Sequence, residues 1–337
     1  MSILPVFVGL DYHDMVVEVS VMETDGRELA HRRCTNQVLE IAEVAERFQR
    51  PVRAAIEACT GAAALADELV SSRGWSVDMA HPGYVSRMKQ NPDKNDFADA
   101  RLLADLERVG YLPKVWLAPE AIRQLRRVVR YRQQLVAERR NIKLRIRALL
   151  RENRIASPDG CPWTERWMCA LKAIANLDGE SRWLMERHLR RLEQVSQEIR
   201  VVERRLRTLT RNDVLVEKLQ SIKGIGLITA VTLRAEIGRF DRFRSGKQLS
   251  RFCGLSPRNA SSGQRQADAG LIKAGNRELR TVLIEAAHCL MRCDPRWQSL
   301  AWKLRQCGKP GSVVAAAVAN RFVRWLFHQM KCYGLSL

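Results

Sequence analysis

The opening of the chain has a side-chain pattern that only a β-sheet can satisfy. Residues 5–11 read PVFVGLD, an apolar run that ends in a carboxylate, and residues 16–22 alternate apolar and polar side chains. These patterns are typical of a buried strand and a half-buried strand. A turn at residues 24–26 separates the second strand from a third at 28–34. We therefore predict a meander of antiparallel hairpins.

Helices and strands are predicted to alternate in the segments that follow. Helical periodicity covers residues 38–48 and 62–72, and short apolar strands are predicted at 52–57 and 75–80. A last helix is expected from about Pro92 to Gly110. The order is three strands, helix, strand, helix, strand, helix, so residues 1–118 are predicted to form an α/β domain.

The rest of the chain reads as all-α. A long basic helix is expected from Pro119 to Asn153, and a second helix carries a coiled-coil heptad whose apolar positions step by three and four residues. These positions are Leu192, Val195, Ile199, Val202, Leu206 and Leu209. The two helices are predicted to pair as an antiparallel hairpin or across subunits. We assign residues 119–212 to this coiled-coil region and 213–337 to a helical C-terminal domain, with Gly311 starting its last apolar helix.

Charge is distributed unevenly over these regions. The whole chain has 57 Lys and Arg against 37 Asp and Glu, a formal net charge of +20. Residues 1–118 carry a net charge of −5, residues 119–212 of +12 and residues 213–337 of +13. A surplus of this size favours a polyanionic partner, so nucleic acid is the first expectation.

Composition also excludes some classes of protein. Nine cysteines without a Cys-x-x-Cys pair argue against a disulfide framework and an ordinary zinc site, and we expect them to be reduced and mostly buried. No apolar stretch approaches the length of a membrane span, and no secretory leader is evident. A cytoplasmic protein fits best.

Four carboxylates are predicted to converge in the first domain. Asp11 ends the first strand, Glu57 ends the fourth, and Asp96 and Asp99 share one face of the last helix. Four clustered carboxylates repel one another unless cations neutralise them, and oxygen ligands favour Mg²⁺ or Mn²⁺. Such metals promote phosphodiester chemistry. The plainer alternative is that the helical pair complements the helix dipole and the strand-end acids face water.

The C-terminal domain contains two candidate nucleic-acid contacts. Lys223-Gly224-Ile225-Gly226 lies between two short predicted helices, like a helix-hairpin-helix, where glycines let backbone N–H groups approach a phosphate. A Gly-x-Gly turn is also an ordinary connection between helices. Further along, Ser261-Ser262-Gly263 lies on a predicted loop among cationic residues: Arg258, Arg265, Lys273, Arg277 and Arg280.

A serine among fixed guanidinium groups is suited to attack a phosphodiester, with the cations stabilising the charged transition state. The alternative is a flexible Ser-Gly connector beside a solvated basic face.

Other candidates have simpler interpretations. His13, near Asp11, is interpreted as a partly exposed loop residue. Cys289 and Cys293 are interpreted as core residues. The same interpretation applies to three tryptophans, Trp297, Trp302 and Trp325.

The four acids resemble the Asp, Glu, Asp, Asp set of the ribonuclease H-like fold, in its RuvC-like branch. The segments GLDYHD, IEACTG and DKNDFADARLLADL further resemble the bacterial insertion-sequence family one-ten, with its eleven-eleven subgroup and the Piv-type invertases, which are called DEDD transposases. Cys253-Gly254-Leu255, Ser262-Gly263 and the Lys273 to Arg280 segment are similar to that family's C-terminal signature. Asn95 departs from the family's pattern beside Asp96.

The resemblance implies an activity and partners. It implies that Asp11, Glu57, Asp96 and Asp99 bind Mg²⁺ or Mn²⁺ and that Ser262 forms a covalent phosphoserine link to DNA during strand exchange. It also implies donor and target duplexes, a structured noncoding guide (bridge) RNA, and a homo-oligomer, a dimer or a dimer of dimers. Two other classes stay open: a junction-resolving endonuclease that uses water as nucleophile, and a non-catalytic nucleic-acid scaffold.

Overall fold

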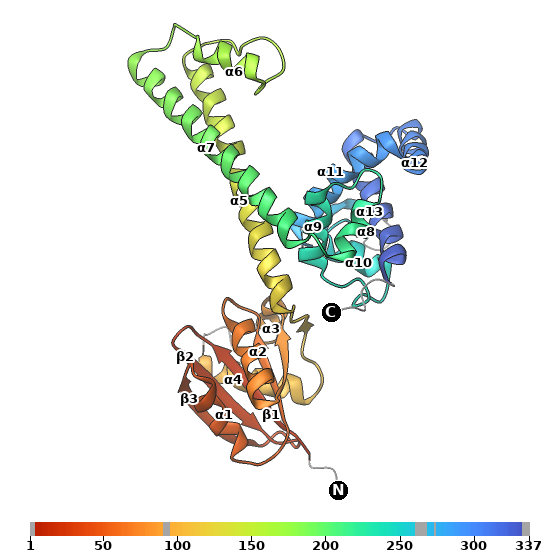
Figure 1. Ribbon diagram of the computed structural model, residues 1–337. Coiled ribbons are helices and arrows are strands. Elements are labelled where there is room, and N and C mark those ends of the chain that lie inside the picture. Colours follow the sequence, from red (N-terminus) through yellow and green to blue (C-terminus); the bar gives the residue numbers. More distant parts are fainter. Residues whose placement is uncertain (1–3, 90–94, 260–267, 273, 332–337) are drawn as a thin grey trace. The chain divides into compact units, whose positions relative to one another are not determined.

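The computed structural model describes residues 4–89, 95–259, 268–272 and 274–331. The chain divides into two compact units, Met1–Ala118 and Pro119–Leu337. Each is described by itself below (Figure 1). Within the described residues, no helix combines the length and the hydropathy that crossing a bilayer requires.

The first unit is built on a six-stranded mixed sheet in the order β3-β2-β1-β4-β5-β6. The three opening strands form the predicted antiparallel meander, and β4 and β5 add parallel to β1. A short β6 closes the far edge, antiparallel to β5. The strands are β1 Val6–Tyr12, β2 Val16–Met22, β3 Glu28–Thr35, β4 Val52–Glu57, β5 Ser76–Ala80 and β6 Lys114–Val115.

Helices cover both faces of this sheet. Helices α1 (Val38–Glu46) and α2 (Ala62–Arg73) pack on one face, where alternate strand residues such as Leu10 and Ile56 form the main core of the unit. Helix α4 (Asp96–Arg108) packs on the opposite face against β1, β2 and β4. A short α3 (Pro82–Met88) precedes it. The α/β architecture with a central mixed sheet is the one expected of a ribonuclease H-like domain.

The helix expected from Pro92 begins later than predicted. Asn95 is the N-cap residue, and its side-chain oxygen accepts hydrogen bonds from the backbone N–H groups of Phe97 and Ala98 at 3.1 and 3.4 Å. Asn, Asp and Ser at this position satisfy N–H groups that have no partner inside the helix. The helix therefore starts at Asp96, which lies in its first turn together with Asp99.

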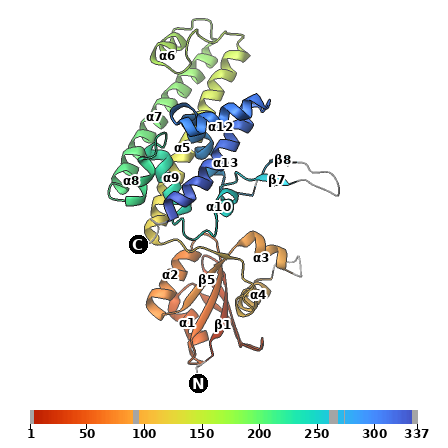
Figure 2. The ribbon, with the colours of Figure 1, turned by 90° about the vertical axis from the view of Figure 1, so that its right-hand side faces the viewer.

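In its described residues, the second unit is helical except for one two-stranded hairpin. Two long helices, α5 (Glu120–Glu152) and α7 (Gly179–Leu209), lie side by side, and α6 (Glu165–Lys172) lies at the end where they are joined (Figures 1 and 2). The remaining elements are α8 Val214–Gln220, α9 Leu227–Ile237, α10 Gly246–Phe252, β7 Pro257–Asn259, β8 Asp268–Leu271, α11 Arg277–Cys293, α12 Pro295–Gln306 and α13 Gly311–Met330.

Helices α5 and α7 run antiparallel within one chain. Arg132 pairs with Glu203 near one end of the contact, and Arg191 pairs with Glu138 nearer the other. The heptad residues from Leu192 to Leu206 are buried, whereas Leu209 is 43% exposed. This is the hairpin alternative of the two pairings predicted for these helices.

The hairpin shares its core with the C-terminal helices. Buried Glu236 of α9 accepts a hydrogen bond at 2.9 Å from Arg130 of α5 and another at 2.9 Å from Asn276, the N-cap residue of α11. One continuous apolar cluster extends from α5 to α13. This shared core joins the two long helices and the C-terminal helices into one compact unit, Pro119–Leu337.

Candidate metal centre

Strand β1 presents alternate residues to helix α4. Gly9 lies so close to this helix that a Cβ atom there would be 1.8 Å from the carbonyl oxygen of Ala100. Asp11 follows two residues later on the same face of the sheet, because side chains alternate along a strand. The close packing at Gly9 therefore places the carboxylate of Asp11 beside the first turn of α4.

Asp11 and Asp96 meet on either side of one imidazole. His13 Nε2 lies 3.3 Å from Asp11 Oδ2 and 3.4 Å from Asp96 Oδ2. One ligand atom from each of the three residues lies within 4.8 Å of the other two, a spacing that suits a metal ion. Asp11 Oδ2 and His13 Nε2 are both buried, and beyond the contacts just given, neither atom has a hydrogen-bond partner among the described residues. Buried polar atoms of native proteins usually have a partner, so this pair of atoms fits a bound cation.

The electrostatics of Asp11 agree with a site that needs positive charge. Burial raises the pKa of its carboxyl group, His13 lowers it, and the negative charges of Asp96 and Asp99 raise it again. The net result is a pKa above the ordinary value. Without a cation, the structure thus disfavours the ionised carboxylate that a metal would stabilise.

Glu57 lies on the strand next to Asp11. The parallel register of β1 and β4 pairs Leu10 with Ile56, so the next positions along the two strands are Asp11 and Glu57. Ala55, two residues earlier, packs with residues of α4 in a small core cluster, which puts Glu57 on the α4 face as well. Glu57 is half-buried and lies outside the tight Asp11–His13–Asp96 group.

Asp99 is close to the cluster but already has a partner. It shares the first turn of α4 with Asp96, and its charge raises the pKa of Asp11. Lys89 Nζ lies 2.6 Å from Asp99 Oδ2, with both side chains largely buried. An ammonium group therefore neutralises this acid. Lys89 was not among the residues singled out from the sequence.

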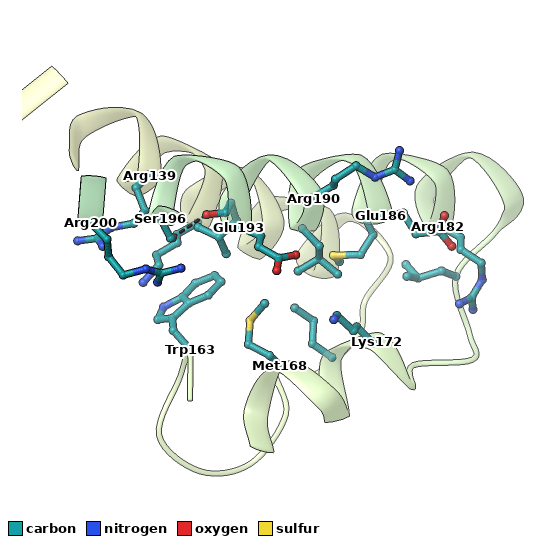
Figure 3. Close-up of a pocket in the computed structure, with 16 residues that line it drawn as sticks. Arg139, Trp163, Met168, Lys172, Arg182, Glu186, Arg190, Glu193, Ser196 and Arg200 are labelled. Carbon is teal, nitrogen blue, oxygen red and sulfur yellow. Dashed lines mark hydrogen bonds between the residues drawn. The ribbon is translucent and has the colours of Figure 1, made fainter. Parts of the chain in front are cut away.

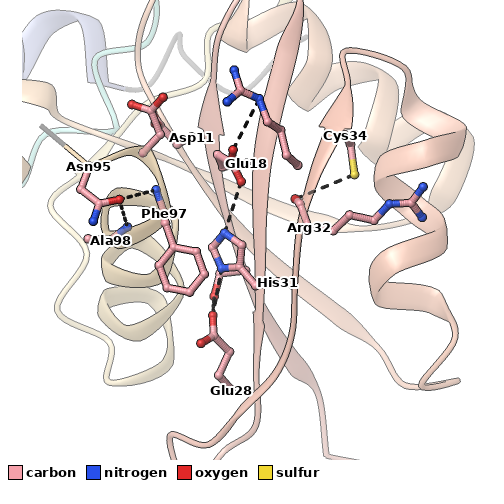
Figure 4. A network of polar contacts seen from close by, with 12 residues as sticks. Asp11, Glu18, Glu28, His31, Arg32, Cys34, Asn95, Phe97 and Ala98 are labelled. Atoms are coloured by element: carbon pink, nitrogen blue, oxygen red, sulfur yellow. Dashed lines mark hydrogen bonds and ion pairs between the residues drawn. The ribbon is translucent and has the colours of Figure 1, made fainter.

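A fifth acid stands opposite Asp11 and has a different role. The hairpin register pairs Asp11 with Glu18 of β2, which is 8% exposed. His31 Nε2 lies 3.3 Å from Glu18, and its other ring nitrogen lies 3.0 Å from Glu28 (Figure 4). The ring of Phe97, on α4, stacks on His31 with centroids 3.6 Å apart. This network satisfies Glu18 and ties the first turn of α4 to the sheet.

The glycines predicted to approach phosphate lie in different environments. Gly224 has φ +95°, and a Cβ atom there would be 3.0 Å from Cys293 Sγ, so this glycine serves the packing of α11. Gly226 is exposed, is the N-cap residue of α9 and has open space beside it. Lys223 is also exposed. The Gly226 end of the turn is thus the part that is open to a phosphate.

The cationic residues near the predicted serine loop also differ. Arg258 on β7 and Arg277 at the start of α11 are exposed. Arg280 donates a hydrogen bond at 2.9 Å to the carbonyl of Ile272, at the base of the β7–β8 hairpin. Ser261, Ser262, Arg265 and Lys273 lie outside the described residues.

Two glycines fix the base of this hairpin. A Cβ atom on Gly275 would be 2.2 Å from the Cα of Gly254, which itself has φ +66°. Only residues without a side chain allow this approach of two backbone segments. The turn after α10 and the turn before α11 are therefore in direct contact on either side of the hairpin.

Comparisons with known proteins match both units. A family model described as a DEDD transposase of the IS110 group matches residues 8–154, and the model described as the transposase IS116/IS110/IS902 family matches residues 216–301. A probable family 20 transposase of Pseudomonas aeruginosa is 30% identical over 97% of this chain and 98% of its own length.

Two further relatives carry insertion-sequence names. The transposase for insertion sequence element IS1328 of Yersinia enterocolitica is 28% identical over 94% of each chain. The transposase for IS1111A of Coxiella burnetii is 27% identical over 69% of this chain and 66% of its own. Similarity therefore extends beyond the acidic first unit to most of the chain.

Proposed function

Since the chain belongs to the IS116/IS110/IS902 family of DEDD transposases, we propose that it cleaves and rejoins DNA strands at a divalent metal centre in its first unit. The observation that carries this proposal is the meeting of Asp11, His13 and Asp96 within 4.8 Å, around two buried atoms that have no hydrogen-bond partner among the described residues outside this group. Hydrolytic or transfer chemistry at phosphodiesters is the usual use of such a cluster.

Asp11, Glu57, Asp96 and Asp99 are the proposed ligands of Mg²⁺ or Mn²⁺, and His13 joins them. When bound, the metal would polarise the scissile phosphate and stabilise the leaving oxygen. Asp96 and Asp99 are held in place by the Asn95 cap, and Asp11 by the packing of β1 on α4 at Gly9. Lys89 neutralises Asp99. The chain's own contribution is to hold these oxygen atoms together against their mutual repulsion.

Ser262 is the proposed nucleophile. Its Oγ atom would form a bond to the scissile phosphorus while the bond from phosphorus to a deoxyribose oxygen breaks, which leaves a free hydroxyl on the cut strand. A hydroxyl of the other duplex would then attack the same phosphorus and release the serine. One phosphodiester bond is exchanged for another at each step, so strands are rejoined without hydrolysis or an external energy source.

Basic residues of the second unit are proposed to hold the nucleic acids. Exposed Lys223, Arg258 and Arg277, together with the open backbone at Gly226, suit contacts to phosphates, as do Arg265 and Lys273 on the predicted loop. We further propose a noncoding guide RNA, a homo-oligomer and a cytoplasmic location. Membership of the eleven-eleven subgroup remains a prediction from the sequence, as does the three-part division of the chain at residues 118 and 212.

A denaturation-resistant adduct tests the strand-exchange mechanism. The full chain is mixed with labelled DNA ends of its element, the element's RNA and Mg²⁺, and the products are separated on a denaturing gel. We expect a protein–DNA adduct that is lost in Ser262→Ala and Asp11→Asn and kept in Ser261→Ala, the matched control. An adduct that persists in Ser262→Ala would refute the assignment of the nucleophile.

The same experiment distinguishes strand exchange from a second candidate function. Asp11, His13 and Asp96 all lie in the first unit, so their metal site does not require the serine loop to be complete. This favours a junction-resolving endonuclease, with water as nucleophile, as the alternative. It predicts cut DNA without an adduct, and cleavage that survives Ser262→Ala. A scaffold without catalytic activity predicts no cut DNA in any of the variants.

A further inference from the structure

The joined end of the α5–α7 hairpin contains a cavity of about 800 Å³, between α7 on one side and α6 with its preceding loop on the other (Figure 3). Its floor is apolar, formed by residues such as Met168, Leu171 and Met185. Ligand pockets for small organic groups commonly have volumes of this order and walls of this kind. The tip of the hairpin therefore has room for a guest with a hydrophobic part.

Cations dominate the rim of this cavity. Arg139, Lys172, Arg190 and Arg200 line it, and in the described part of the chain none of them forms an ion pair or a hydrogen bond. Two acids, Glu186 and Glu193, also line it. The excess is positive, so the charge of the pocket is complementary to an anion.

Trp163 forms the wall at the end of the cavity where Arg139 and Arg200 lie (Figure 3). It has φ +69°, in the left-handed region that a residue of this size rarely adopts. Its neighbour Trp167 is 1% exposed and donates a hydrogen bond to the carbonyl of Pro158, so that ring belongs to the core. Trp163 packs against Trp167, with ring centroids 4.7 Å apart, and is half-exposed at the pocket in an unusual backbone conformation, a feature often found at functional sites.

Further cations lie against this ring. Lys143 Nζ and the guanidinium carbon of Arg147 lie 4.7 and 5.4 Å from the centroid of the Trp163 ring. The pKa of Lys143 is lowered by burial and by the positive charges of Arg139 and Arg147. Like charges are thus gathered at one aromatic ring, and an anion would relieve their repulsion.

From this geometry we infer that the cavity binds an unpaired nucleotide of a nucleic-acid strand, with its base against Trp163 and the apolar floor and its phosphate at Arg139, Lys143 and Arg200. Aromatic rings that stack bases beside cations that hold the backbone are the usual means of binding single strands. A base inside an intact duplex is already stacked and paired, so the pocket selects for unpaired positions. The inference rests on the proposed function only in taking nucleic acid as the ligand.

Binding of short strands to the full chain tests this inference. The probes are fluorescein-labelled single strands of about twelve nucleotides, one RNA and one DNA, and the duplex of the DNA strand, all without divalent metal. We expect Trp163→Ala to weaken single-strand binding roughly tenfold and duplex binding less than about twofold. Trp163→Phe should retain most of the affinity. The relative losses for RNA and DNA show which strand the pocket prefers.

Matched variants exclude an indirect effect on folding. Trp183 lies on α7, is 50% exposed and has Arg187 over its ring, but it does not line the cavity, so Trp183→Ala should bind both strands normally. Arg139→Gln and Arg200→Gln leave the tryptophan packing intact and should each weaken single-strand binding. The affinity of each variant should also depend less on salt concentration than that of the wild type. Arg205→Gln, on α7 like Arg200 but away from the cavity, is the control for the loss of a positive charge.

Three results would overturn the inference. These are normal single-strand binding by Trp163→Ala, an equal loss of duplex and single-strand binding, and displacement of the probe by polyglutamate as effectively as by unlabelled oligonucleotide. The outcome is independent of the metal centre. Single-strand binding is measured without divalent metal and the adduct is measured with Mg²⁺, so a failure of the proposed cleavage and a failure of this pocket give different patterns.

Discussion

The ammonium of Lys89 lies 2.6 Å from Asp99 Oδ2, so one of the four acids predicted to bind metal holds a cation that belongs to the chain itself. A divalent ion that uses Asp99 must compete with this ammonium. The contact thus lowers the affinity of Asp99 for a metal ion. It also reduces the electrostatic repulsion among the acids.

Lys89→Met should therefore bind Mn²⁺ more tightly. The change removes the competing charge and leaves the carboxylates in place, so we expect roughly a three- to tenfold lower dissociation constant by isothermal titration calorimetry. Arg101→Gln, which removes an exposed positive charge from α4, is the control and should change the affinity little. Weaker binding by Lys89→Met would instead mean that the lysine supports the site.

Asp11→Asn should stabilise the metal-free first unit at neutral pH. The pKa of Asp11 is raised in the folded state by burial and by Asp96 and Asp99. Its protonated form is therefore favoured by folding, and the stability that protonation contributes is lost as the pH rises through the folded-state pKa. Asparagine removes that dependence.

Thermal unfolding with and without Mg²⁺ measures this effect. In a chelator, the wild-type chain should lose stability relative to Asp11→Asn as the pH rises from the ordinary pKa of an aspartate through the raised folded-state pKa, and Mg²⁺ should raise its melting temperature more than that of the variant. If Asp11→Asn is less stable than the wild type at pH 7 without metal, the negative charge of Asp11 is already stabilised by other groups of the protein.

His13→Asn should change metal preference as well as affinity. An imidazole nitrogen is a better ligand for Mn²⁺ than for Mg²⁺, which prefers oxygen. If His13 binds the ion, its loss should weaken Mn²⁺ binding several-fold more than Mg²⁺ binding, measured by competition between the two ions. His288→Asn on α11 is the control. Equal losses for both metals would mean that His13 only positions the two carboxylates.

Gly9→Ala should disrupt the site from a distance. The new methyl group would overlap the backbone of α4 at Ala100 and Ala104, and overpacking of this kind typically costs about 1–3 kcal/mol or more. Because α4 carries Asp96 and Asp99, metal affinity should fall together with stability. Gly83→Ala, whose Cβ would make only ordinary contacts, is the matched control in the same unit. Normal Mn²⁺ binding by Gly9→Ala would contradict the link between packing and site.

The sequence predicted β1 to β5 well, because these strands are short apolar runs or alternate apolar and polar side chains. It placed Asp11 and Glu57 at neighbouring strand ends, which the register of β1 and β4 confirms. It started α4 four residues early, because Pro92 is a common helix-start signal and the Asn95 cap was treated only as a departure from a family pattern. It missed α3 and β6, which are too short to show a period.

The partners around the acids were harder to predict. His13 lies just beyond the β1 residue that pairs last with β2, and neither spacing nor periodicity reports where a loop side chain points. Lys89 comes ten residues before Asp99, and only the tertiary path of the chain brings them together. Glu18 was recoverable in principle, since the hairpin register places it opposite Asp11.

Some predictions about burial were wrong. Trp302 is 60% exposed, although its neighbours Trp297 and Trp325 contact each other and Phe322 in the core, because α12 buries only one narrow side. Of the described cysteines, Cys34 and Cys253 are buried and the others are exposed or intermediate. Residue type gives only an average tendency, and the face of a short helix decides the individual case.

The contact between Gly254 and Gly275 makes a substitution at either position depend on the backbone at the other. A side chain at position 275 has no room while the backbone of Gly254 stays where it is, so a mutation at one position can be accepted only after the other segment has shifted. Among descendants of this gene, we expect the two positions to change jointly or not at all. The base of the hairpin would then be inherited as a single unit.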